Sequence, residues 1–169
     1  MMNVMVESIP IRRSPTELHE LLASSLEVLK RQASNLDVAF TIEASNDLPK
    51  DICIDPEKIA WAVATLVGNA LRYARPGTRL MPGGSVVVHL AYVREKDEVV
   101  IRVQDDGPGI PADKLPWLFQ RANGKMHAAG LGLMLIHDVV TAHGGRIDVK
   151  SRTSGFEHGT SIALHIPAH

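Results

Sequence analysis

A run of apolar residues near the centre of this sequence ends in two acids and two glycines. Residues 99–103 have the β-branched composition of a buried strand, and Asp-Asp-Gly-Pro-Gly follows at residues 105–109. Gly107 and Gly109 allow the backbone to adopt positive φ or to let another group come close. The carboxylate of Asp105, held at the strand's end, can accept hydrogen bonds but cannot donate them, which suits the exocyclic amine of a purine. The motif is short, and by itself it favours the simpler interpretation of a polar loop after a strand.

The composition predicts one soluble globular domain. The chain has 169 residues, of which 45% are hydrophobic and 22% charged, and its net charge of −1 argues against a general nucleic-acid or membrane surface. The single cysteine, Cys53, excludes an internal disulfide and is typical of a reducing compartment. No apolar run reaches the ~18–20 residues that span a bilayer, and residues 1–10 lack the basic start and apolar centre of a signal peptide.

A second informative stretch is the helix predicted for residues 56–73. Asp55 can cap this helix, with Pro56 at the first helical position. Side chains three and four residues apart share a helix face, which separates two stripes. The apolar stripe consists of Ile59, Val63, Leu66 and Ala70, and the other stripe of Thr65, Asn69, Arg72 and Tyr73. We expect the apolar stripe to face the core.

Gly68 and Asn69 are unusual residues for the interior of this helix. Glycine weakens a helix interior by ~1 kcal/mol relative to alanine, and a buried carboxamide without partners costs a further ~1–3 kcal/mol. The amide oxygen of Asn69 is a hard ligand that suits Mg²⁺. A hydrogen bond from Asn69 to a neighbouring loop explains the residue equally well, so both interpretations stay open.

A third informative stretch begins where a loop meets a helix. Residues 121–130 have no apolar period and contain Lys125, so we predict a mobile loop that could act as a lid. Gly130 and Gly132 stand at the start of a helix that runs to the Gly-Gly pair at residues 144–145. Backbone N–H groups at such a start attract phosphate, although glycines also occur at ordinary helix starts.

The remaining patterns predict short strands and two further helices. We expect a helix over residues 16–33, capped by Ser14, with Pro15 at the first position and Glu17 closing a capping box. The expected strands cover residues 38–42, 52–54, 85–93, 99–103, 146–151 and 160–166, and a short helix covers residues 111–120. A polar turn at residues 94–98 joins two of these strands into a hairpin.

The three stretches, in this order and on these elements, would enclose one nucleotide-sized pocket. From about residue 14 to residue 167 the chain resembles the catalytic ATP-binding domain of sensor histidine kinases, in the superfamily that includes gyrase-type ATPases. Residues 65–73 resemble the family's N box, residues 105–109 its G1 box, residues 118–121 its F box and residues 130–133 its G2 box, and residues 143–147 and 159–160 match its closing pattern. The resemblance implies an α+β fold, a two-layer sandwich of the Bergerat type in which a mixed, mostly antiparallel sheet of about five strands packs on three main helices.

The resemblance also implies roles for individual residues toward ATP and Mg²⁺. Asn69 would bind the Mg²⁺ that bridges the phosphates and Arg72 would meet phosphate oxygens, which makes these two the expected catalytic residues. Tyr73 would line the pocket, and Asp105 would bind the adenine amine. The other expected nucleotide-binding residues are Gly107, Gly109 and Ile110 near the base, Gly130, Leu131, Gly132 and Leu133 around the phosphates, and Lys125 from the lid.

The chain departs from the family's pattern at several positions. Ala64 and Thr65 stand where the family often has Glu-Asn, and the absent Glu could help to polarise an acceptor histidine. This departure bears on the strength of a kinase and not on nucleotide binding. Gln120 and Ala122 stand where the F box usually has Glu and an aromatic residue, and Ala128 replaces a glycine.

No stretch of the sequence fits the family's phosphoacceptor motif, which resembles Ser-His-Glu-Leu-Arg on a helical hairpin. The resemblance therefore implies that residues 15–169 are the catalytic domain and that residues 1–14 are a remnant of a preceding segment or linker. The acceptor histidine would lie on a separate dimerisation domain, so the chain alone would be inactive in autophosphorylation. The implied partners are ATP, that dimerisation domain and the receiver domain of a response regulator, without nucleic acid or membrane insertion. The implied location is the cytoplasm, as part of a parent protein that could be membrane-anchored.

Two other functions stay open. One is a regulatory module that senses ATP or ADP without transferring phosphate, which Ala64 and Thr65 favour. The other is a serine kinase of the anti-sigma type, which shares the fold, although the F-box remnant at Leu118 and Phe119 favours the sensor kinase. Other enzyme classes fit poorly because the sequence lacks the G-x-x-x-x-G-K-S/T, H-E-x-x-H, C-x-x-C and G-x-S-x-G motifs.

Overall fold

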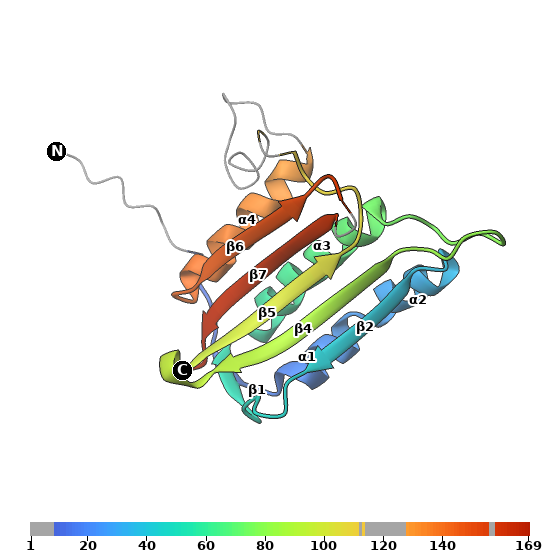
Figure 1. The fold of residues 1–169 in the computed structure, drawn as a ribbon. Helices are drawn as coiled ribbons and strands as arrows, with labels where there is room; N and C mark the ends of the chain where they lie inside the picture. Colours follow the sequence, from blue (N-terminus) through green and yellow to red (C-terminus); the bar gives the residue numbers. More distant parts are fainter. Residues whose placement is uncertain (1–8, 112, 114–127, 156–157) are drawn as a thin grey trace.

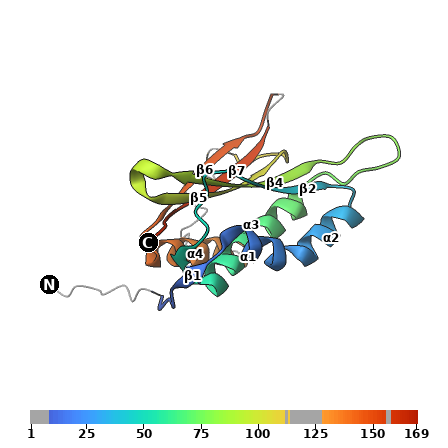
Figure 2. The same cartoon turned by 90° about the horizontal axis from the view of Figure 1, so that it is seen from below.

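A five-stranded sheet with helices on one face forms the body of the protein (Figures 1 and 2). The computed structural model describes residues 9–111, 113, 128–155 and 158–169. The sheet has the order β2-β4-β5-β7-β6. Its strands are β2 (Ala39–Ala44), β4 (Ser85–Val93), β5 (Glu98–Asp105), β6 (Arg146–Arg152) and β7 (Gly159–Pro167). Only the β2–β4 pair is parallel, so the expected two-layer α+β fold with a mixed, mostly antiparallel sheet is confirmed.

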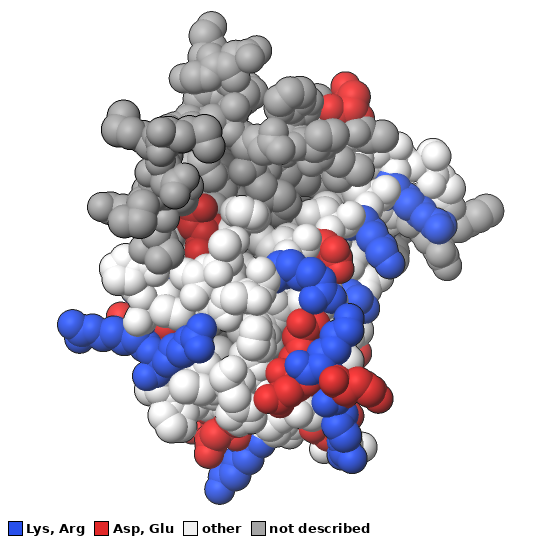
Figure 3. Space-filling model, turned by 90° about the vertical axis from the view of Figure 1, so that its left-hand side faces the viewer, with Lys and Arg blue, Asp and Glu red and all other residues white. Residues whose placement is uncertain are grey.

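The helical layer lies against one side of this sheet (Figure 2). Its helices are α1 (Leu18–Ser25), α2 (Glu27–Asn35), α3 (Pro56–Tyr73) and α4 (Ala128–Ala142). A 3-10 turn at Arg94–Lys96 connects β4 to β5, and a separate two-stranded sheet pairs β1 (Ser14–Thr16) with β3 (Ile52–Ile54). Within the described part of the chain, no helix is long and apolar enough to cross a membrane. On the face shown in Figure 3, Lys and Arg side chains lie among Asp and Glu side chains, as on an ordinary solvated surface.

The core lies between the sheet and the helices because strand side chains alternate between the two faces of the sheet. Ile101 of β5 pairs with Leu90 of β4 on one side and with Leu164 of β7 on the other, and none of the three is more than 1% exposed. Full burial of such a side chain stabilises a fold by about 1.5–3 kcal/mol. The opposite face of β5 carries the exposed Arg102 and Gln104, as expected for an antiparallel sheet with one face in water.

Helix α3 has the predicted bounds, and the local sequence explains how it begins. The Oδ1 atom of Asp55 accepts a hydrogen bond from the N–H of Lys58 at 3.1 Å, and Pro56 occupies the first helical position. The predicted apolar stripe is buried in full: Ile59, Val63, Leu66 and Ala70 are at most 6% exposed. The prediction for this helix is therefore confirmed in bounds, capping and orientation.

The prediction of one helix over residues 16–33 with Ser14 as its cap is wrong. The first helix begins at Leu18, and Glu17 caps it by accepting the N–H of Glu20 at 2.6 Å. Ser14 instead belongs to β1, where it pairs with Ile54 of β3. Its backbone is therefore part of a strand pair and does not start the helix. Leu26, with φ −98° and ψ 6°, separates α1 from α2. The spacing of the apolar residues continues through this break, so the sequence pattern could not reveal it.

Asp55 also connects the start of α3 with two distant parts of the chain. Its Oδ2 atom accepts the N–H of Arg12 at 2.8 Å, and its own N–H donates to Nε2 of His143 at 3.0 Å. Nδ1 of His143 lies 2.8 Å from the carbonyl oxygen of Val139, so the ring is a neutral imidazole protonated at Nδ1. His143 follows α4 and is 2% exposed, and burial lowers the pKa of its imidazole below the ordinary value. A charged His143 would have to break the bond to Asp55.

The free energy of unfolding should depend on pH through His143. Because its folded-state pKa lies below the unfolded value of about 6.5, the stabilisation is present above pH ~6.5 and is lost as the pH falls through the folded-state pKa. We expect the unfolding free energy of the native protein, measured by urea titration, to fall in this range by up to about 1.4 kcal/mol per pH unit from this one group. His143→Gln should remove this component of the slope.

His19→Gln is the matched control, since His19 is exposed on α1 and should leave the slope as it is in the native protein. Equal slopes for the native protein and His143→Gln would show that His143 is not the titrating group.

Candidate functional site

A cavity of about 330 Å³ opens between α3, the end of β5, the segment that follows it, β7 and α4. Its walls are mostly apolar, with the polar groups of Asn69, Asp105 and Thr160 among them. The residues that line it are Leu66, Asn69, Ala70, Tyr73, Val103, Asp105, Pro108, Gly109, Ile110, Pro111, Leu133, Thr160 and Ile162. A flat apolar ligand with one or two polar edges would suit such a cavity.

Asp105 is the last residue of β5, and the strand ladders determine its place. It pairs with Val86 of β4 and with Thr160 of β7. Its Oδ1 atom accepts the N–H of Gly107 at 2.9 Å. Burial raises the pKa of the Asp105 carboxyl above its ordinary value, while hydrogen bonds from the backbone of Gly107 and Thr160 act in the opposite direction. The site therefore presents a partly desolvated acceptor to the cavity.

The two glycines after Asp105 serve different purposes, both of which the sequence suggested. Gly109 has φ +79°, and a Cβ atom there would collide with the carbonyl oxygen of Arg152. At Gly107 a Cβ atom would lie 3.0 Å from Oδ1 of Asp105 and 3.3 Å from the carbonyl oxygen of Tyr73. Gly109 thus permits a left-handed turn, and Gly107 permits the close approach of the Asp105 carboxylate.

The polar stripe of α3 divides between two cavities. Asn69 and Tyr73 line the first cavity, and the side chain of Tyr73 is largely exposed. Arg72 does not line it but borders a second cavity of about 470 Å³ between α2 and α3, together with Gln32, Leu36, Thr65, Gly68, Asn69 and Leu71. Asn69 is thus the residue that both cavities share. The structure brings Asn69 and Asp105 together and leaves Arg72 on the neighbouring side of the helix.

Gly130 lies in the first turn of α4, which begins at Ala128, and Gly132 lies at the start of the second turn. The predicted loop over residues 121–130 is therefore too long, because residues 128–130 are already helical. Leu133 of the same helix lines the first cavity. The predicted helix at residues 111–120, the F-box residues 118–121 and Lys125 lie outside the described residues, so these predictions are untested.

Reasoning from the sequence assigned no role to Thr160, which lines the cavity beside Asp105, or to Ser151, which contacts Thr160 from β6. The Oγ atom of Ser151 lies 3.0 Å from Oγ1 of Thr160 and accepts the N–H of Ile110 at 2.6 Å. These contacts depend on the register of β7 against β5 and β6, and no local pattern reveals that register.

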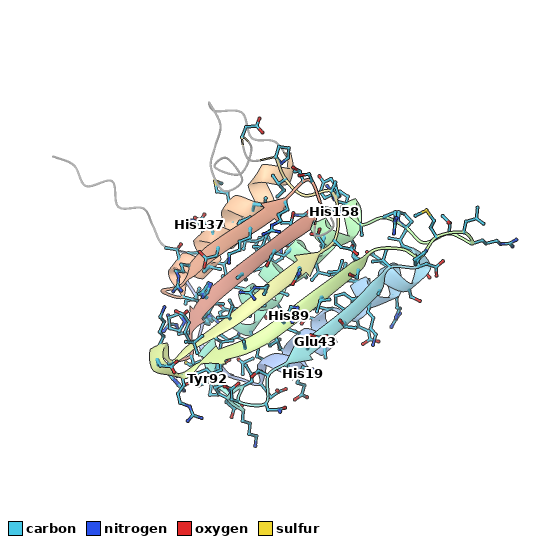
Figure 4. All side chains as sticks on the ribbon, in the orientation of Figure 1. His19, Glu43, His89, Tyr92, His137 and His158 are labelled. Atoms are coloured by element: carbon cyan, nitrogen blue, oxygen red, sulfur yellow. The ribbon has the colours of Figure 1, made fainter. Side chains whose placement is uncertain are left out.

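A metal site made by protein side chains alone is absent from the described residues, where no group of three or more His, Cys, Asp or Glu side chains could hold an ion. The labelled histidines in Figure 4 lie on separate elements and do not form a cluster. A cation near Asn69 would therefore need most of its ligands from a bound molecule or from water, as Mg²⁺ commonly does.

Comparison with known proteins identifies the family. Residues 54–169 match the family described as histidine kinase-, DNA gyrase B-, and HSP90-like ATPase. The signal transduction histidine-protein kinase AfsQ2 of Streptomyces coelicolor is 34% identical over 120 residues, which is 68% of this chain and 20% of AfsQ2. The chain spans between 20% and 39% of the length of the first three curated relatives that it matches.

Solved structures show the same fold. The mycobacterial sensor histidine kinase MprB superposes with a TM-score of 0.72 at 26% identity, over 92% of this chain and 99% of that one. Full-length ShkA in complex with AMPPNP superposes with a TM-score of 0.77 at 22% identity, over 95% of this chain and 32% of that one. The chain therefore belongs to the histidine kinase-, DNA gyrase B- and HSP90-like ATPase family, as an ATP-binding catalytic domain of the histidine-kinase type.

Proposed function

We propose that this domain binds ATP together with Mg²⁺ and presents the γ-phosphoryl group to a histidine on a separate dimerisation domain. The observation that carries the proposal is the position of the Asp105 carboxylate in the same apolar cavity as Asn69 and Leu133. Asp105 supplies a partly desolvated acceptor to the cavity, and Leu133, from the second turn of α4, lines the same cavity. A receiver domain of a response regulator would accept the phosphoryl group afterwards.

The purine end of the site rests on Asp105. Its carboxylate accepts hydrogen bonds and cannot donate them when ionised, so it pairs with the 6-amino group of adenine and repels the 6-oxo group of a guanine or hypoxanthine ring. Ile110, Val103 and Ile162 supply apolar walls for the ring. The pocket therefore favours adenine nucleotides over the other purine nucleotides.

The phosphate end of the site rests on backbone groups. Gly130 lies in the first turn of α4, where N–H groups without helical partners and the helix dipole favour an anion, and Gly132 follows at the start of the second turn. Phosphoryl transfer depends mainly on positioning and on charge neutralisation rather than on covalent chemistry by the enzyme. The backbone of α4 would therefore orient the phosphates, with Lys125 and Arg72 as further cations.

Asn69 fits the role of a magnesium ligand. It lines the cavity from α3, and among the described residues its side chain has no hydrogen-bond partner. When bound, Mg²⁺ would neutralise and align the phosphate oxygens. Asn69 would hold the ion through its amide oxygen and so place the phosphates relative to α4.

A second function, sensing of ATP or ADP without phosphoryl transfer, is supported by Thr65. Its Oγ1 atom donates to the carbonyl oxygen of Trp61 at 2.8 Å, so the hydroxyl is engaged within its own helix. Ala64 beside it carries no polar group. Neither residue offers a base to an incoming histidine. Incubation of the full-length parent with γ-labelled ATP separates the two functions, because only the kinase forms phosphohistidine.

Asp105→Asn should weaken the binding of ATP by about 10- to 100-fold, since a neutral amide replaces the acceptor and an N–H can face the adenine amine. Titration calorimetry in the presence of Mg²⁺ measures the effect. The amide oxygen of Asn can still accept the N–H of Gly107, as Oδ1 of Asp105 does at 2.9 Å, so the variant should remain folded.

Asp106→Asn is the matched control for this change. Its Oδ1 atom accepts the N–H of Ser85 at 2.8 Å, on β4, and Asp106 does not line the first cavity. The Asp106→Asn substitution removes the same charge one residue away and should leave the affinity for ATP within about twofold of that of the native protein. An unchanged affinity in Asp105→Asn would refute the assignment of this carboxylate.

Asn69→Ala should abolish the Mg²⁺ dependence of ATP binding, so that affinities measured with Mg²⁺ and with a chelator become equal within about twofold. Thr65→Ala, one helical turn away on the same stripe, should retain the dependence of the native protein because its hydroxyl contacts only the helix backbone. If Asn69→Ala still binds ATP more tightly with Mg²⁺, to the same extent as the native protein, then Asn69 is not the ligand.

A further inference from the structure

The segment after β5 is hydrogen-bonded to two residues of the β6–β7 hairpin. We call residues 106–110, which follow Asp105, the base loop. The N–H of Ile110, at the end of the base loop, donates to Oγ of Ser151 on β6 at 2.6 Å. The carbonyl oxygen of Gly107 lies 2.6 Å from Nδ1 of His158, just ahead of β7. Figure 4 shows His158 near the end of the sheet where β5 stops.

Hydrogen-bond chemistry determines the direction of both contacts. A carbonyl oxygen only accepts, so Nδ1 of His158 carries a proton that it donates to Gly107. A backbone N–H only donates, so Oγ of Ser151 accepts from Ile110. The hydroxyl proton of Ser151 is left for the carbonyl oxygen of Gly159 at 3.1 Å or for Oγ1 of Thr160 at 3.0 Å. Ser151 therefore joins the base loop to the start of β7.

The same contacts extend to the carboxylate in the cavity. Gly107 donates its N–H to Oδ1 of Asp105 while its carbonyl oxygen accepts from His158. Gly107 is thus hydrogen-bonded both to Asp105, which is proposed to bind the adenine, and to His158 of the hairpin. The hairpin also abuts β5 directly, because a Cβ atom at Gly159 would collide with the carbonyl oxygen of Asp105. The orientation of the Asp105 carboxylate therefore depends on the hairpin.

We propose that Ser151 and His158 are positioning residues that set the base selectivity of the pocket. Neither lines the first cavity, and both act through the base loop on Asp105. A carboxylate held in one orientation rejects a 6-oxo purine because two acceptors then face each other. A carboxylate on a loosened loop can turn aside or admit water, and the rejection weakens. This inference rests on the proposed function and adds residues to its base site.

The test compares the affinities of ATP and ITP, which differ in having an amino or an oxo group at the purine 6-position. Ser151→Ala removes the acceptor for Ile110 and should lower the ratio of the two affinities at least about fivefold. Ser161→Ala is the matched control: Ser161 lies on β7, lines a depression on the opposite face of the sheet together with Ser151 and His158, and does not line the first cavity. It should leave the ratio unchanged. Titration calorimetry with Mg²⁺ gives both affinities for each variant.

His158 provides an independent pair of variants that does not alter a strand. His158→Ala should also lower the ATP-to-ITP ratio, whereas His158→Asn should restore it, since the amide N–H of Asn occupies the position of Nδ1. A loss of stability alone would weaken both nucleotides by one factor and leave the ratio as in the native protein.

The outcomes separate this inference from the proposed function. If the native protein prefers ATP to ITP, and Ser151→Ala and His158→Ala both keep the native ratio of the two affinities, the role of Ser151 and His158 is overturned while the proposed function stands. If the native protein binds both nucleotides equally, the selectivity assigned to Asp105 is overturned as well. Absence of ATP binding by the native protein would overturn both proposals.

Discussion

The pairing of β5 with β4 and β7 is the constraint on which the rest of the structure depends. The same ladders that place Ile101 between Leu90 and Leu164 in the core carry Asp105, four residues later, to the wall of the cavity beside Thr160. Side chains alternate between the faces of a strand, so a slip of one residue would expose Ile101 and turn Asp105 out of the cavity. Core and candidate site therefore share one set of backbone hydrogen bonds.

The helices that enclose the cavity are related to each other through Asp55. This residue caps α3, which carries Asn69, and its N–H binds His143 immediately after α4. Its carboxylate also receives the N–H of Arg12, so the segment before β1 contacts the residue that connects both helices. The first turn of α4 and the polar stripe of α3 thus occupy positions that depend on a junction at the other end of both helices.

Local patterns predicted the elements well where one stretch of chain determines its own structure. The Asp55-Pro56 start and the apolar stripe of α3 are of this kind, and so is the glycine stop after α4, where Gly144 has φ +77°. The pattern failed at Ser14, which was expected to cap a helix, because pairing with β3 forms only when residues 14–16 and 52–54 meet. Six residues assigned to the nucleotide from the sequence line one cavity: Asn69, Tyr73, Asp105, Gly109, Ile110 and Leu133. Their roles toward ATP stay predictions.

By itself the sequence determined which functional groups are available for binding. These are an acid followed by two glycines after a strand, an amide inside a helix, and a glycine pair where another helix begins. Only the tertiary structure decided which of these groups meet. It placed Asn69 and Asp105 on one cavity and Arg72 on the neighbouring cavity. It also brought Ser151 and His158 into hydrogen-bond contact with the base loop. The physical reason is that local patterns report periodicity and turns, whereas strand order and register arise from hydrogen bonds between segments far apart in the chain.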